Sequence, residues 1–274
     1  SRNAIIIAPW GYPPSWKKAK YNIRINERGI NIEGNCLTCN GTFALISALS
    51  SDQSDIKLRK VLIFALDSIV SPENSKNGQS FRHDLNKVLS SWIDNLIATC
   101  DCCKNLNRDL LTTTFLPGIG TYYGYEFKGT IEHIFLKAFS KIVRELRDVQ
   151  NPYVFLDVTH GINYQTIAIL YATISALISI DPYGTLENRL FIVNSEPYPT
   201  GYRSEPCIKL SHKPEWKTEI PSTEILNFSK LQSMIRLIRT VSNLINLDER
   251  GLFSIKKEMK SDKTIEPMLK QLLN

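Results

Sequence analysis

The sequence predicts an α/β fold with a mainly parallel sheet and helices on both faces of that sheet. Two observations lead to this prediction. Short, continuous apolar runs, which are typical of strands buried on both faces, alternate along the chain with longer segments of helical periodicity. The 274 residues suffice for one large domain, or for a domain of about 200 residues with an appendage.

The first half of the chain alternates between these two patterns. Apolar runs predict strands, apolar residues at helical spacing predict helices, and two short runs around Glu27-Arg28-Gly29 predict a hairpin. In chain order we expect a strand at 4–10, a hairpin of 20–25 with 30–32, a helix at 41–50, a strand at 61–66, a helix at 81–100 and a strand at 110–116.

The second half continues the alternation and ends in a helical region. The helix at 130–149 has a clear amphipathic pattern, because its apolar residues share one face. Ser, Asn, Lys and Gly at 71–80 predict a mobile loop, as do the residues at 196–206. The remaining expected elements are strands at 153–158, 190–193 and 207–210, a helix at 162–180, a boundary at 214–221 and two or three helices within 222–274.

The helix that follows His160 is unusual, because residues 167–172 are apolar on all of its sides. A helix that covers a sheet on one face normally carries a polar stripe. Two explanations are open. The helix is buried beneath the C-terminal region, or it packs on its own copy in a twofold dimer.

The bulk composition is that of a soluble globular protein, with 43% hydrophobic and 22% charged residues. The net charge of +6 allows an anionic ligand or RNA as a partner but does not require one. No run of about 18 uninterrupted apolar residues occurs, which predicts no membrane span, and the first residues lack the pattern of a signal peptide. We therefore expect a cytoplasmic location.

The cysteines do not predict a metal site. A zinc site would need four well-spaced ligands, whereas the second cysteine cluster lacks a clean pair spacing and has no histidine at finger spacing. We expect buried free thiols and neither metal nor cofactor, with disulfides as the alternative for a hyperthermophilic host. The six cysteines are Cys36, Cys39, Cys100, Cys102, Cys103 and Cys207.

Residues 157–163, Asp-Val-Thr-His-Gly-Ile-Asn, are the most informative segment, since they join a predicted strand to a predicted helix. In open α/β sheets, ligands collect outside the carboxyl ends of the strands, and helix N-termini there favour anions. A site for a phosphate-bearing ligand is therefore predicted. Acid–base catalysis by Asp157 and His160 is the alternative, but Asp157 is expected to cap N–H groups of the turn. The predicted ligand contacts are Thr159, His160, Gly161 and Asn163.

Three other segments are predicted to end at the same edge of the sheet. One ends the first strand, where an aromatic ring can stack on a base. Another precedes the first helix, and a third is a glycine-rich loop at 118–124. The convergence of four segments on one edge indicates a single binding crevice. The predicted contacts in these three segments are Trp10, Gly11 and Tyr12, then Asn40, Gly41 and Thr42, then Gly120 and Thr121.

Each of these segments also has a structural alternative. The aromatic residues after the first strand can serve surface packing, and Asn40 or Thr42 can be an ordinary helix N-cap. The loop at 118–124 can be a lid or a dimer contact. Its glycine spacing matches neither a P-loop nor a dinucleotide fingerprint, which disfavours P-loop hydrolysis of nucleoside triphosphates, and no such fingerprint opens the first helix, which disfavours a dehydrogenase.

The segment at 157–163 resembles the Asp-x-Thr/Ser-His-Gly-x-Asn signature of CRISPR-associated Rossmann-fold (CARF) sensor proteins. It is most similar to the archaeal branch that joins this domain to a HEPN ribonuclease domain. Residues 8–11, Ala-Pro-Trp-Gly, and 40–44, Asn-Gly-Thr-Phe-Ala, also fit that family. The resemblance covers 1–215 and implies a Rossmann-like sensing domain there, followed by a helical linker or the start of an effector domain at 222–274.

The resemblance also implies a ligand and an assembly. Two CARF domains would form one composite pocket in a homodimer for a cyclic oligoadenylate made by type III CRISPR complexes, commonly the four-adenylate ring. A twofold dimer suits such a ring. Residues 159–163 would contact phosphate or ribose, and 40–42 with 10–12 would hold bases and backbone. Binding would then switch an attached effector, through which alone RNA is a partner.

One departure from the family concerns the ribonuclease. The HEPN motif is an arginine followed, after four to six residues, by a histidine, and no histidine here has that spacing. The catalytic motif is therefore absent from these 274 residues. Two other functions stay open: a ring nuclease that cleaves its ligand through the ribose 2′-hydroxyl, and a CARF-type transcriptional regulator. The histidines are His83, His133, His160 and His212.

Overall fold

A five-stranded, wholly parallel sheet forms the centre of the protein, in the order β5-β4-β1-β8-β9. The predicted fold class, an α/β fold of Rossmann-like type, is confirmed. The structure is a computed structural model that describes residues 2–51, 54–69, 81–122, 124–181, 189–198 and 206–208, together with Ile235 and Ile238.

The strands of the sheet are the apolar runs seen in the sequence. Residues 4–8 of β1 and 61–66 of β4 are fully buried, because each of these strands has a neighbour on both sides and helices above and below. The strands are β1 (Arg2–Trp10), β4 (Ile56–Leu66), β5 (Leu111–Leu116), β8 (Tyr153–Asp157) and β9 (Leu190–Val193).

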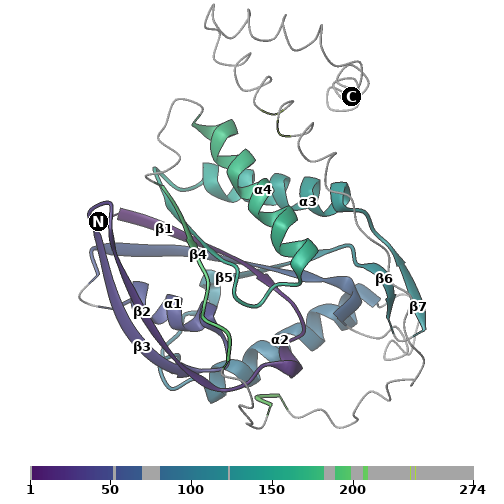
Figure 1. The fold of residues 1–274 in the computed structure, drawn as a ribbon, viewed down its shortest axis with the longest axis horizontal. Helices are drawn as coiled ribbons and strands as arrows, with labels where there is room; N and C mark the ends of the chain where they lie inside the picture. The colour runs from purple at the N-terminus through teal and green to yellow at the C-terminus, as the bar shows by residue number, and fades with distance from the viewer. Residues whose placement is uncertain are drawn as a thin grey trace, which may run out of the picture.

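Helices cover both faces of the sheet (Figure 1). The first two lie on one face and the last two, which pack against each other, lie on the opposite face. This two-sided arrangement follows from the strand order, because the chain moves from β1 to one edge and then returns to the other side of β1. The helices are α1 (Gly41–Leu49), α2 (Phe81–Thr99), α3 (Ile131–Arg147) and α4 (Asn163–Ile180).

The predicted first hairpin is confirmed and is longer than the sequence pattern suggested. Strands β2 (Ala19–Glu27) and β3 (Ile30–Thr38) pair in antiparallel fashion along their whole length. Their turn needs two left-handed residues, and Arg28 and Gly29 have φ values of 52° and 71°. The hairpin packs over α1, where a side chain at Gly34 would meet the Cβ of Ala48 at 2.9 Å.

The structure corrects the expected loop at 118–124. Strands β6 (Ile119–Tyr122) and β7 (Tyr125–Lys128) form a second antiparallel hairpin. Gly124 has a φ of 78° and supplies the left-handed residue of its turn. The hairpin is short and exposed, and its polar, aromatic-rich sequence shows no clear alternation of apolar and polar residues.

The predicted strand at 207–210 is wrong for the residues that are described. Pro206 makes a single bridge with Lys17, and Cys207 and Ile208 lie in a bend. Proline lacks the N–H group needed to extend a ladder. The expected loop at 71–80, the boundary at 214–221 and the helical region at 222–274 lie outside the described residues, except for Ile235 and Ile238, which pack on the core.

Helix α4 is long and apolar enough to cross a membrane by length and composition alone. In the fold, 44% of its residues are buried, and it packs on α3 and β1 as a core helix does. Ile167 is 39% exposed, and Leu170, Ile174 and Ile178 are half-buried along the same stripe. Of the described elements, none covers this outer apolar stripe completely.

The cysteines form three disulfides, so the expectation of buried free thiols is wrong. The hairpin β2–β3 folds over α1 and brings β3 beside the residues that follow α2, where Asp101 N–H donates to the carbonyl of Leu37 at 3.2 Å. Spacing along the chain does not reveal this proximity. The pairs are Cys36–Cys102, Cys39–Cys207 and Cys100–Cys103, with Cα–Cα distances of 5.7, 6.2 and 5.3 Å.

Candidate functional site

The candidate site lies at the carboxyl ends of β1 and β8, where the strand order changes direction. Strands β4 and β5 extend from one side of β1, whereas β8 and β9 extend from the other. Ligands of open α/β sheets bind in the crevice that such a switch point leaves. The loops after the two strands are joined directly, because Gly11 N–H donates to the carbonyl of His160 at 2.7 Å.

Asp157, the last residue of β8, organises this junction from a position that is 2% exposed. One carboxylate oxygen accepts the N–H of Thr159 at 3.0 Å, and the other accepts the hydroxyl of Thr42 at 2.7 Å. The indole N–H of Trp10 donates to that same hydroxyl at 3.0 Å. The predicted capping of the turn by Asp157 is confirmed, and a buried chain of hydrogen bonds connects β1, α1 and β8.

His160 accepts hydrogen bonds rather than delivering protons. Its Nε2 lies 3.1 Å from the backbone N of Gly41 and 3.2 Å from the hydroxyl of Tyr21. A backbone N–H can only donate, so Nε2 carries the lone pair and the ring proton is assigned to Nδ1. Burial lowers the pKa of His160, although the charge of Asp157 opposes this shift. A neutral, half-buried imidazole whose Nε2 is already hydrogen-bonded suits positioning of the loop better than acid–base catalysis.

Tyr21, on β2, was missed by the sequence reasoning. Burial raises the pKa of its hydroxyl, and a hydrogen bond with the Tyr198 hydroxyl at 3.3 Å raises it further. The hydroxyl therefore stays protonated beside His160. The alternation of inward and outward side chains along β2 could have indicated its position, since Tyr21, Ile23 and Ile25 share the inner face of the hairpin.

Three glycines allow the loops of the site to pack together. A Cβ at Gly161 would lie 2.1 Å from the hydroxyl oxygen of Thr166 and 2.9 Å from the Cβ of Pro9. A Cβ at Gly11 would lie 2.9 Å from the carbonyl oxygen of His160. At Gly41 the nearest atom would be the Thr159 hydroxyl oxygen, at 3.2 Å. These glycines thus permit close approach of protein segments to one another.

Two of the predicted contacts have structural roles. The side-chain oxygen of Asn40 accepts the N–H groups of Thr42 and Phe43, at 2.6 and 3.3 Å, so the N-cap interpretation is confirmed. Trp10 is 0% exposed and packs edge-on against Trp16 and Phe43. The predicted stacking of Trp10 on a base does not fit this burial, because both faces of the indole are covered within the chain.

The other predicted contacts lie at the surface of the crevice or beside it. Asn163 is exposed at the first turn of α4, and Thr159 is half-buried, with its hydroxyl accepting the N–H of Ser195 at 3.1 Å. Tyr12 packs edge-on against Trp92 of α2. Ligand contact by these residues stays a prediction.

The hairpin β6–β7, with exposed Gly120 and Thr121, lies beside the start of α4. Its Tyr122 contributes, after burial, to raising the pKa of the Tyr164 hydroxyl. The Gly118 N–H donates to the carboxylate of Asp67, the residue that follows β4, at 2.6 Å. The segments around Trp10, Asn40 and His160 are joined by hydrogen bonds, and this fourth segment borders them from the side of α4.

A cavity of about 480 Å³ opens beside the same junction. It lies between the hairpin strand β2 and the edge strand β9, and Gly41, Asp157 and Thr159 contribute to its wall. Its lining mixes apolar side chains with amides and hydroxyls, as ligand pockets do. The polar lining residues outside the junction include Asn22, Arg24, Asn26, Asn194 and Ser195.

The comparisons with known proteins identify the family. The family model described as "CRISPR system endoribonuclease Csx1, CARF domain" matches residues 5–197. The chain belongs to the Csx1 CARF-domain family. The "CRISPR system endoribonuclease Csx1" of Methanocaldococcus jannaschii is 30% identical over 203 residues, which cover 71% of this chain and 37% of that relative. The chain thus spans little more than a third of the relative, and the CARF resemblance of the sequence is confirmed.

The neutral state of His160 has a consequence for the pH dependence of stability. Its pKa is lowered on folding from the ordinary value of 6.5, so the unfolded chain binds a proton at a pH where the folded chain does not. The contribution of His160 to the free energy of unfolding is complete above about pH 6.5. At lower pH it falls, by at most about 1.4 kcal/mol per pH unit. Denaturant unfolding between pH 8 and 5.5 measures this slope.

The variant His160→Gln keeps an acceptor for Gly41 but removes the titration, so it should flatten the slope between pH 6.5 and 5.5. Equal slopes in the wild type and His160→Gln would contradict a lowered pKa of His160 in the folded chain.

Proposed function

We propose that this CARF domain is the sensor of a type III CRISPR defence protein and binds a cyclic oligoadenylate, in the first place the four-adenylate ring. One observation carries the proposal. In a chain of this family, hydrogen bonds of Thr159 and His160 hold the segment 159–163 at the switch point of the sheet, while Asn163 stays exposed there. The ligand is recognised at this crevice, and the chain is a cytoplasmic sensor.

The chemistry of the crevice suits a phosphodiester. The start of α4 presents backbone N–H groups and the positive end of the helix dipole, which favour an anion. Asn163 stands at that first turn with an amide that can donate to phosphate or ribose oxygens. Asp157 and His160 hold the 159–163 segment in position through their hydrogen bonds. Their role in binding is therefore positioning.

The dimer is part of the same proposal. The outer stripe of α4 that includes Ile167 offers an apolar surface, and a twofold axis beside it would bring two copies of the crevice together. A ring of four identical nucleotides matches that symmetry. Ligand binding then shifts the relative position of the two domains and controls a HEPN-type endoribonuclease, through which RNA becomes a partner.

Thermal unfolding with cyclic tetra-adenylate, and with linear tetra-adenylate as the control, tests the proposal. Ligand that binds only the folded state raises the unfolding temperature with concentration, and the ring should do so much more than the linear form. The ring recovered afterwards should be intact. Recovery of cleaved product would favour a ring nuclease instead, and no shift with rings of any size would remove the sensing function.

Asn163→Ala is expected to weaken the binding of cyclic tetra-adenylate by about tenfold or more, because a hydrogen bond to a charged group contributes about 1.5–3 kcal/mol. The free energy of unfolding should change little, since Asn163 is exposed. Asn95→Ala, an exposed asparagine of α2, is the matched control and should bind as the wild type does. Unchanged affinity in Asn163→Ala would take the start of α4 out of the site.

A further inference from the structure

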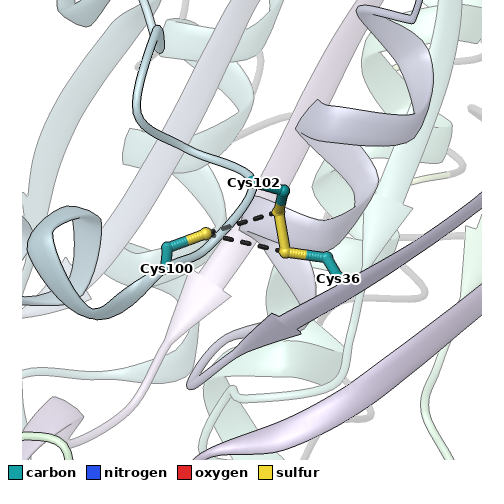
Figure 2. Close-up of side chains that lie close together, drawn as sticks. All are labelled: Cys36, Cys100 and Cys102. Carbon is teal, nitrogen blue, oxygen red and sulfur yellow. Dashed lines mark hydrogen bonds between the residues drawn. A yellow bond between two sulfur atoms is a disulfide. The ribbon is translucent and has the colours of Figure 1, made fainter.

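Four of the six cysteines gather at one point, away from the crevice. Figure 2 shows Cys36 on β3, with Cys100 and Cys102 in the turn that follows α2. Cys103 belongs to the same turn. The Sγ of Cys100 lies 3.6 Å from that of Cys36 and 3.4 Å from that of Cys102, although it is bonded to neither. The Sγ atoms of Cys102 and Cys103 are 4.0 Å apart.

This sulfur cluster is enclosed but can be reached from one side. Cys36, Cys100 and Cys103 are buried, and Cys102 is half-buried. A cavity of about 470 Å³ lies against it, with Cys102 and Cys103 in its wall beside serines 50 and 51 and residues 105–107. The cavity therefore gives a small ion a route to Cys102 and Cys103.

Stabilisation by disulfides does not explain why the two pairs converge. A disulfide stabilises a protein mainly by closing a loop of the unfolded chain, and the effect grows with loop length. Cys100 and Cys103 are three residues apart, so their bond constrains the unfolded chain little, and Cys36–Cys102 already ties β3 to this turn. Neither pair needs to place its sulfurs against those of the other.

We propose that the reduced form of this cluster is a structural zinc site with Cys36, Cys100, Cys102 and Cys103 as its four thiolate ligands. With a Zn–S distance of about 2.3 Å, the sulfurs of a tetrahedral site lie roughly 3.8 Å apart. The contacts between sulfurs that are not bonded to each other are 3.4, 3.6 and 4.0 Å, which bracket this value. The sulfur atoms of Cys36, Cys100 and Cys102 all lie within 4.8 Å of one another.

The disulfide form converts to the zinc form in two steps, reduction and metal binding. Two molecules of a dithiol reductant supply four electrons and four protons, and each becomes a disulfide, while Cys36–Cys102 and Cys100–Cys103 become four thiols. One Zn²⁺ then displaces the four thiol protons and binds the thiolates, so binding weakens as the pH falls. All-sulfur ligation selects a soft or borderline cation such as zinc over Mg²⁺ or Ca²⁺.

The zinc site would hold the β2–β3 hairpin, which contributes to the crevice. Cys36 stands directly opposite Tyr21 in the β2–β3 ladder, and the Tyr21 hydroxyl meets His160. Zinc in the reduced protein would replace the disulfides as the tie between β3 and the end of α2. The hairpin would then keep its position in a reducing compartment, where structural disulfides do not persist.

The experiment uses the full chain, reduced anaerobically with a phosphine until titration shows six free thiols. Zn²⁺ is added, unbound metal is removed and metal content is measured; Co²⁺ replaces zinc for absorption spectroscopy. We expect about one metal ion per chain, the thiolate-to-cobalt and visible bands of a tetrahedral sulfur site, and a higher unfolding temperature with zinc.

Cys36→Ser and Cys102→Ser should lose the tetrahedral sulfur spectrum, and their metal affinity should fall at least tenfold. Cys207→Ser is the matched control, because it breaks only the separate Cys39–Cys207 pair and should bind like the wild type. A fully reduced wild-type chain that shows no cobalt–thiolate absorption overturns the proposal, whatever the folding of the variants. Full binding by Cys36→Ser also overturns it.

Discussion

Replacing Asp157 with alanine is expected to lower the free energy of unfolding by about 3 kcal/mol. The carboxylate is the acceptor for the Thr42 hydroxyl, which is buried, and for the Thr159 N–H, which is partly buried. A buried donor that loses its acceptor costs about 1–3 kcal/mol. Urea unfolding at pH 7.5, compared between the two chains, measures the loss.

Asp157→Asn keeps the size and shape of the side chain and changes its hydrogen bonding. Its amide oxygen can still accept the N–H of Thr159, but its NH₂ group faces the Thr42 hydroxyl, which then has no acceptor there. A smaller loss of about 1–2 kcal/mol is expected. A stability of Asp157→Ala within about 0.5 kcal/mol of the wild type would show that this hydrogen-bond chain does not hold β1, α1 and β8 together.

Gly161→Ala is expected to destabilise the protein by about 2–3 kcal/mol and to abolish ligand binding. The added Cβ would meet the Thr166 hydroxyl oxygen at 2.1 Å and Pro9 at 2.9 Å, and overpacking of this kind typically costs about 1–3 kcal/mol. Relief of the overlap moves the loop at 159–163, which carries the predicted contacts. Denaturant unfolding and the ligand-induced thermal shift report the two effects separately.

Two controls locate the cause. Gly124→Ala, at a φ of 78° with no atom within 4 Å of the new Cβ, adds backbone strain without a clash, so its loss of stability measures the cost of strain alone. The double variant Gly161→Ala with Thr166→Ala removes the nearer obstacle and should recover part of the stability. The Thr166 hydroxyl has no hydrogen-bond partner within the described residues, so its removal costs little. Wild-type binding by Gly161→Ala alone would contradict the close packing.

The elements of the sheet could be predicted from the sequence because each is a local pattern. The apolar runs of β1, β4 and β8 and the periodicity of α3 depend on residues close together in the chain. The hairpin β6–β7 was missed because exposed four-residue strands bury too little to leave an apolar alternation. Short elements of this kind are set by their turns, here by Gly124.

The sequence predicted the position of the candidate site, but only some of the roles of its residues. The polar motif at the end of β8 marks the switch point, and the capping by Asp157 follows from local turn chemistry. The contact of Tyr21 with His160 and the burial of Trp10 depend on how the β2–β3 hairpin folds back over α1, a long-range arrangement. The gathering of the cysteines has the same origin.

Calorimetric titration of cyclic tetra-adenylate into the wild-type chain, followed by the same titration into Asn163→Ala, tests the sensing function most directly. We predict saturable binding at one ring for two chains, as a composite pocket on a twofold axis requires, and a clear loss of affinity in the variant. No saturable heat with four- or six-adenylate rings, or full affinity in Asn163→Ala, would contradict a cyclic oligoadenylate site at the switch point of this sheet.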